Sequence, residues 1–142
     1  MSQVTEQDLT ISDLPRWSPI WTFWFVGYFL LLSAITTMAY LRILDVGWLL
    51  SFVHSDVVAH ILLVGMAGYL LHRALARRCW SLWGLALPIG PLIFTAISIF
   101  EESMQGLSPN RTFSWLDMFG SVLGVWLFFA LDWLDRKRHS SH

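Results

Sequence analysis

The stretch IWTFWFVGYFLLLSAITTMAYL, residues 20–41, decides the fold, because it carries no charged side chain over a length that can cross a lipid bilayer. A transmembrane helix needs about 20 predominantly apolar residues. Three further stretches meet that requirement, at residues 56–75, 80–100 and 113–134. We therefore expect an all-α, polytopic membrane protein that folds as a four-transmembrane-helix bundle.

Composition favours the same class. Of the 142 residues, 56% are hydrophobic and only 13% are charged, which is too apolar for an ordinary soluble domain. The formal net charge of -1 provides no overall basic field, so no nucleic acid partner is expected. A single cysteine, Cys79, excludes an intrachain disulfide framework and a multi-cysteine metal site.

The charged residues predict how the chain is organised and oriented. Residues 1–16 form a polar N-terminal segment whose acidic side chains are unlike the basic start of a secretory leader. The four spans lie within a domain at 17–135, and 136–142 form a basic tail. Short loops rich in arginine and lysine stay in the cytoplasm. Seven such residues fall on the side of the two termini and two on the other side, so both termini are expected to be cytoplasmic.

Small residues predict close packing of the helices. Gly65 and Gly68 lie in the second span, and Gly120 and Gly124 form a GxxxG pair in the fourth. Glycines at such spacing let two helices approach closely in a membrane. Two prolines in the third span, Pro88 and Pro91, predict a kink or local unwinding there.

Seven polar residues are expected at the non-cytoplasmic ends of three spans. Those on one helix are three or four positions apart, so they share a face. Ionisable residues in or near hydrocarbon usually face the bundle interior and pair with another group. The sequence therefore predicts one polar, ligand-binding pocket. Its residues are Asp56 and His60, Glu102 and Gln105, Arg111, and Asp117 and Ser121.

Simpler interpretations stand beside this one. Asp56 is equally well a helix cap, and Ser114 with Asp117 matches a capping box at the start of the fourth span. His60 can be a core histidine that is hydrogen-bonded to Asp56. Arg111 can be an interfacial anchor.

Other charged residues are expected to face solvent. Glu101 is turned about 100° away from Glu102 on a helix and is interpreted as its solvated neighbour. Asp132, Asp135 and Arg136 are interpreted as surface charges, with Asp132 and Arg136 able to pair across one helical turn.

The order of these polar residues resembles the VanZ-like membrane family. Asp-x-x-x-His at positions 56 and 60 is followed by Glu-x-x-Gln at 102 and 105, Arg111, Asp117 and Gly124. The resemblance covers about residues 45–135. Ser121 stands where the family commonly has asparagine, and Val57 stands where it commonly has lysine.

The resemblance implies a cell-envelope protein of the bacterial cytoplasmic (inner) membrane. That family is named for glycopeptide resistance and is also found beside cell-surface polysaccharide synthesis, and no reaction is implied. Expected partners are membrane lipid, a polyprenyl-phosphate-linked saccharide and proteins of envelope polysaccharide synthesis.

Two functions compete for the predicted pocket. In the first, an accessory protein binds an anionic headgroup through Arg111 and protonated His60, because guanidinium groups bind phosphate oxygens in pairs. In the second, a membrane-embedded hydrolase or transferase uses His60 as a base and Glu102 as an acid or base. No nucleophile motif identifies catalytic residues, no cofactor is expected, and a metal site is disfavoured because His60 lacks a partner at metal-binding spacing. Proton-coupled transport is disfavoured by the absence of a repeat.

Overall fold

The structure, a computed structural model, describes residues 17–41, 56–82, 85–107 and 113–139. Within these ranges the chain is helical except for one short hairpin. Its elements are α1 (Pro19–Tyr40), α3 (Asp56–Ala74), β1 (Cys79–Leu82), β2 (Leu85–Pro88), α4 (Ile89–Gln105) and α5 (Trp115–His139).

Three of these helices, α1, α3 and α5, are long and apolar enough to cross a membrane. Their bounds match the predicted spans at residues 20–41, 56–75 and 113–134 closely at most ends, although α5 continues through His139 into the predicted basic tail. Helix α1 buries none of its residues, and side chains such as Phe23 remain 73% exposed. A large exposed apolar surface of this kind needs lipid or another protein to cover it.

The prediction of a helical third span from residue 80 is wrong in its first half. Residues of β1 and β2 form an antiparallel hairpin in which Cys79 pairs with Pro88. Pro88 occupies the N-cap position of α4, and Pro91 lies in its first turn. A proline has no N–H to donate, and the first turn of a helix needs none, so both prolines fit the start of a helix better than its interior. The expected kink is replaced by a helix start.

Helix α4 is therefore shorter than the other three. Its 17 residues span roughly 25 Å at 1.5 Å per residue, against about 30 Å of bilayer hydrocarbon. It is not among the candidate spans, while its face towards α3 and α5 is buried.

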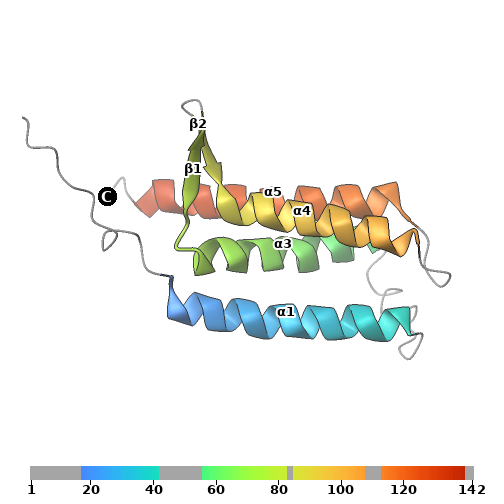
Figure 1. Cartoon of the computed structure of the whole chain (residues 1–142). Coiled ribbons are helices and arrows are strands. Elements are labelled where there is room, and N and C mark those ends of the chain that lie inside the picture. The colour runs from blue at the N-terminus through green and yellow to red at the C-terminus, as the bar shows by residue number, and fades with distance from the viewer. Residues whose placement is uncertain (1–16, 42–55, 83–84, 108–112, 140–142) are drawn as a thin grey trace, which may run out of the picture.

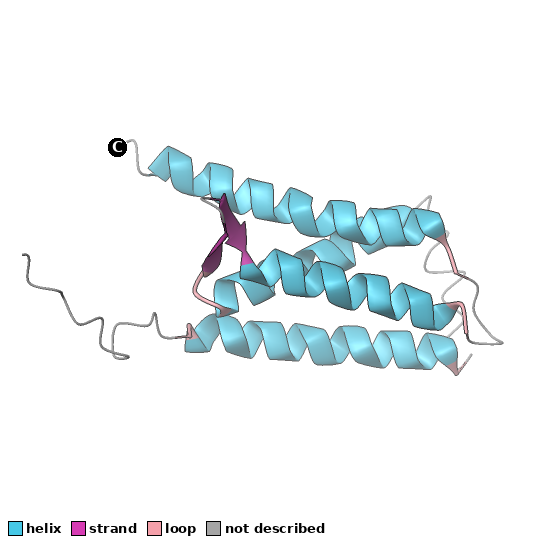
Figure 2. Ribbon diagram, turned by 45° about the horizontal axis from the view of Figure 1, so that its top comes forward, coloured by secondary structure: helices cyan, strands magenta, loops and turns pink. Residues whose placement is uncertain are grey.

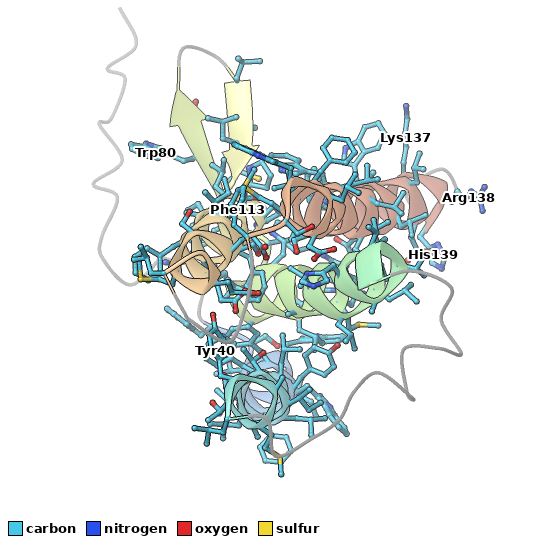
Figure 3. The ribbon with its side chains drawn as sticks, turned by 90° about the vertical axis from the view of Figure 1, so that its right-hand side faces the viewer. Tyr40, Trp80, Phe113, Lys137, Arg138 and His139 are labelled. Atoms are coloured by element: carbon cyan, nitrogen blue, oxygen red, sulfur yellow. The ribbon has the colours of Figure 1, made fainter. Side chains whose placement is uncertain are left out.

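Helix α3 is the centre of the bundle. It contacts α1, α4 and α5, and its most extensive contact is with α5. Viewed along the helices, α3 lies between α1 on one side and the α4–α5 pair on the other (Figure 3). The hairpin leaves the bundle sideways near the end at which α5 finishes (Figures 1 and 2).

Glycines set the distance between α3 and α5, as the sequence predicts. A Cβ atom added to Gly124 would lie 2.8 Å from the Cα of Ile61, and one added to Gly65 would lie 2.8 Å from the carbonyl oxygen of Gly124. Real Cβ atoms essentially never come that close to another atom. At Gly68 the added atom would lie 3.1 Å from the methyl groups of Val125, which is fully buried. The close backbone contact between α3 and α5 therefore leaves no room for a side chain at Gly65 or Gly124.

Substitution Gly124→Ala is expected to lower the thermal unfolding temperature of the protein in detergent. The added methyl group forces α3 and α5 apart, and overpacking of this kind costs about 1–3 kcal/mol. Gly27→Ala is the matched control, because a Cβ atom at Gly27 of α1 has no neighbour within 4 Å. Equal unfolding temperatures for the two variants would contradict the role assigned to the α3–α5 contact.

Candidate functional site

The helix ends divide the polar residues into two groups. The start of α3, the end of α4 and the start of α5 meet at one end of the bundle, which we call the carboxylate end (Figure 1). The start of α1, the end of α3 and the end of α5 meet at the other, where Ser18 N donates to the carbonyl of Ala74 at 3.2 Å. We call this second end the arginine end, because it carries Arg73, Arg77 and Arg136.

At the carboxylate end, a hydrogen bond joins α3 to α5. His60 Nδ1 lies 3.0 Å from Ser121 Oγ, and the serine hydroxyl can donate to this nitrogen when it is unprotonated. Ser121 is 4% exposed, and Gly120 beside it lies close to α3, because a Cβ atom added there would be 3.0 Å from Val57 Cγ1. Two residues that the sequence placed in one pocket are therefore in direct contact, although 61 positions separate them.

Glu102 lies in the last turn of α4 and joins it to the start of α5. Its side chain is almost fully buried, with the residue 2% exposed, and Oε1 accepts a hydrogen bond of 2.9 Å from the backbone N–H of Ser114. His60, Glu101 and Asp117 all lie close enough to the Glu102 carboxyl to act on it electrostatically. Four ionisable residues therefore share this end.

The capping interpretation of Ser114 is confirmed in part. Ser114 Oγ accepts a hydrogen bond of 3.3 Å from the backbone N–H of Asp117, as an N-cap serine should. In a capping box, the residue at the position of Asp117 would accept the N–H of the cap in return. Here the acceptor is Glu102, from the neighbouring helix. The start of α5 is thus fixed to the end of α4.

Gln105 is buried, and its partner is Glu101, a residue outside the pocket that the sequence predicts. The residue is 6% exposed, and Nε2 donates to both carboxylate oxygens of Glu101 at 2.9 Å. Glu101, interpreted from the sequence as a solvated neighbour, is half-buried and takes part in this network. A pair four positions apart on α4 therefore borders the carboxylate end.

Two predicted pocket residues cannot be placed. Arg111 and the side chain of Asp56 lie outside the described part of the chain. The capping interpretation of Asp56 and the anchoring interpretation of Arg111 therefore stay predictions. Within the described residues, no group of three or more histidine, cysteine, aspartate or glutamate side chains is arranged to hold a metal ion.

The sequence interpretation of Asp132 as a surface charge is wrong. Its side chain is 1% exposed and lies at the arginine end, where Arg77 donates to both carboxylate oxygens at 3.0 and 2.9 Å. Arg73 Nε lies 3.1 Å from the same carboxylate, and Arg136 Nε lies 3.4 Å from it. The expected pairing with Arg136 is present, but the dominant partners come from the end of α3, 55 and 59 positions earlier.

The backbone of the α3–β1 turn places Arg77 against Asp132. Ala76 and Arg77 both have left-handed backbone conformations, with φ of 50° and 57°. Such conformations are unfavourable for residues other than glycine, at a cost of order 1–3 kcal/mol each. The two hydrogen bonds from the Arg77 guanidinium to the buried carboxylate offset part of that cost.

His72 is a second residue that the sequence did not single out. It is fully buried on α3, its ring lies 5.2 Å from that of Phe129, and neither ring nitrogen has a hydrogen-bond partner among the described residues. Gly90 makes room for it, because an added Cβ atom would lie 2.6 Å from the His72 Cα. The presence of this histidine inside a predicted transmembrane span is the feature of the sequence that could have identified it.

Comparisons with protein-family models, curated proteins and solved structures found no match to this chain.

Substitution Asp132→Ala is expected to destabilise the protein strongly. It leaves three arginines at the arginine end without their shared counter-charge. Because their side chains are 21–39% exposed and water can solvate them, the expected cost is about 1.5–3 kcal/mol, below that of a fully buried pair. Thermal unfolding in detergent measures the effect. Asp135→Ala on the same helix is the control, because the Asp135 side chain is 63% exposed, and its expected change is small. Similar losses for both variants would mean that Asp132 is a surface charge after all.

Proposed function

We propose that this chain is a multi-pass protein of the bacterial cell envelope that binds the polar headgroup of a lipid-linked saccharide at its carboxylate end. The observation that carries the proposal is the Glu102 carboxylate, 2% exposed and surrounded by His60, Asp117 and Ser114 from two other segments. Buried ionisable residues near a membrane surface are costly and usually serve a function.

A structural role alone does not account for a carboxylate at this position. Among the described residues, the Glu102 side chain accepts one hydrogen bond, from the Ser114 N–H. The amide oxygen of a glutamine can accept the same bond without the cost of burying a charge. A second demand on the side chain, such as a hydrogen bond to a ligand hydroxyl, accounts for an acid rather than an amide at this position.

The chemistry of the carboxylate end favours a sugar. Its described residues supply three carboxylates and a histidine, which accept hydrogen bonds from hydroxyl groups, and they lie at the helix ends, where a headgroup would lie. Arg111 would bind the phosphate of such a lipid, as the sequence predicts. The resemblance to the VanZ-like family supports the envelope setting, and through it a role in polysaccharide or peptidoglycan metabolism or in glycopeptide resistance.

The proposed orientation has the carboxylate end on the outer surface of the inner membrane, with both termini in the cytoplasm. All described arginine and lysine residues lie at or next to the arginine end, and positive charge of this kind is retained in the cytoplasm. In this arrangement α4 is the fourth crossing. It packs against α3 and α5. After α4 the chain reverses direction at the carboxylate end, as a bundle of four antiparallel segments requires.

Glu102→Gln is expected to leave thermal stability unchanged or raised while weakening headgroup binding about tenfold. The amide keeps the Ser114 hydrogen bond and loses one carboxylate oxygen for the sugar. Binding of polyprenyl-diphosphate-linked N-acetylglucosamine to the purified protein, titrated by native mass spectrometry, measures the change.

Ser103→Ala is the matched control on α4, since Ser103 is exposed and its hydroxyl donates to the Ile99 carbonyl of its own helix at 2.7 Å. Polyprenyl phosphate without sugar is the matched ligand, and its binding should not respond to Glu102→Gln. If the saccharide binds the Glu102→Gln and Ser103→Ala variants equally well, Glu102 only fixes the α4–α5 connection and the proposal fails.

A second candidate function, a hydrolase or transferase acting on an envelope lipid or glycan, is favoured by one contact. His60 Nδ1 lies 3.0 Å from Ser121 Oγ, which is the distance at which a histidine activates a serine hydroxyl as a nucleophile. The four-residue spacing of Asp56 and His60 predicts a shared helix face, and in this function the aspartate would orient the histidine. In this mechanism the serine oxygen bonds to the substrate while the bond to the leaving group breaks, and His60 takes the serine proton and passes it to the leaving group. Water or an acceptor hydroxyl then displaces the serine oxygen and frees the enzyme.

If the second function is right, purified protein will release product from lipid-linked saccharides, and Ser121→Ala will reduce the rate by about a thousandfold or more while leaving substrate binding intact. Thin-layer chromatography of radiolabelled lipid measures release. Ser103→Ala again serves as the control. Turnover that survives Ser121→Ala would remove the serine from the mechanism.

A further inference from the structure

The arginine end carries more positive charge than its own carboxylate can neutralise. Three guanidinium groups, from Arg73, Arg77 and Arg136, surround the single carboxylate of Asp132, which leaves a formal excess of two positive charges. Their side chains are 21%, 29% and 39% exposed, so each still reaches the surface. Arg136 Nε is in ion-pair contact with Asp132 at 3.4 Å but makes no hydrogen bond to the described residues. This cluster can accept an anion.

An apolar groove of about 440 Å³ runs along α1 beside this cluster. Apart from the tyrosine hydroxyl, its lining is apolar, and in α1 it is built largely from aromatic rings. Its lining includes Trp21, Trp24, Gly27, Tyr28 and Leu31 of α1, and Leu70 of α3.

Gly27 forms an open part of the groove wall. A Cβ atom added there would have no neighbour within 4 Å, so neither close packing nor backbone conformation requires a glycine. This distinguishes Gly27 from Gly65 and Gly124, which are excluded from having side chains by a facing helix. A glycine in the middle of a helix destabilises it by about 0.5–1 kcal/mol relative to alanine. The missing side chain leaves space that a bound ligand can fill.

The groove and the cluster are continuous. The Arg73 guanidinium carbon lies 4.6 Å above the ring of Trp21, which lines the groove. Tyr69 holds the same guanidinium by accepting hydrogen bonds of 3.0 and 2.7 Å from Nε and Nη2. Leu70 of the groove is one helical turn before Arg73 on α3. A ligand with a chain in the groove would therefore have its head next to the arginines.

We propose that this combined site binds one anionic phospholipid, with its phosphate at Arg73 and Arg136 and one acyl chain in the α1–α3 groove. Charge selects the class of lipid. A net positive cluster attracts a headgroup whose only charge is the phosphate, and it repels the ammonium group of a zwitterionic headgroup. The apolar lining selects a lipid over a free anion. This site lies at the opposite end of the bundle from the proposed saccharide site and is independent of it.

Native mass spectrometry of the full-length protein in detergent tests the proposal, with dioleoyl phosphatidylglycerol and dioleoyl phosphatidylcholine as probes. The wild-type protein is expected to bind phosphatidylglycerol at least about tenfold more tightly. Gly27→Leu adds bulk to the groove at a position where a Cβ atom has no neighbour within 4 Å, and Arg73→Gln removes a charge beside it. Each is expected to weaken phosphatidylglycerol binding by about tenfold.

Two variants serve as matched controls. Val26→Phe adds bulk at a neighbouring exposed position of α1, and Lys137→Gln removes a charge from α5 at the arginine end, where Lys137 lies over Trp133. Both should bind phosphatidylglycerol as the wild type does. Equal binding of the two lipids, or wild-type binding by Gly27→Leu, would overturn the proposal. So would displacement of the lipid by millimolar inorganic phosphate, because that result would identify a free-anion site. Thermal unfolding of Gly27→Leu at the wild-type temperature excludes misfolding as the cause of lost binding.

Discussion

The close contact between α3 and α5 is the constraint on which the rest of the structure depends. Glycines bring the two backbones together, because a side chain at Gly65 would collide with the backbone of Gly124 and one at Gly124 with the backbone of Ile61. In lipid, where apolar side chains gain little from meeting each other, close backbone contact of this kind supplies much of the packing energy between helices. It also fixes the register of α3 against α5, and the register decides which polar residues meet.

Both polar ends are consequences of that register. At one end His60 of α3 meets Ser121 of α5, and at the other Arg73 of α3 meets Asp132 of α5. The glycine contacts lie between these two pairs along the same interface. A shift of one residue between the helices would break both pairs at once. The two ends differ in chemistry, because one gathers carboxylates and the other gathers arginines around a single carboxylate.

Sequence reasoning succeeded where length or local spacing carries the information. The bounds of α1 and α3 follow from apolar length, and the close approach at Gly124 follows from glycine spacing. It failed at residues 79–88, because a continuous apolar run does not by itself distinguish strand from helix. It failed at Asp132 because a neighbour four positions away offered a sufficient partner, while the dominant ones lie 55 and 59 positions earlier. Long-range pairing has no signature in local spacing.

The place of the α3–α5 contact in the chain has a consequence for biosynthesis. Ribosomes deliver the chain from its N-terminus at about 5–20 residues per second. Helix α3 is therefore complete at Ala74 well before Trp115, the first residue of its main partner, is made. In the meantime, His60, Arg73 and the facing glycines have no α5 to meet, and other membrane components can occupy that surface. The interface that holds the bundle together is the last to be completed, so a chain that ends before Trp115 would leave the surface of α3 that faces α5 uncovered.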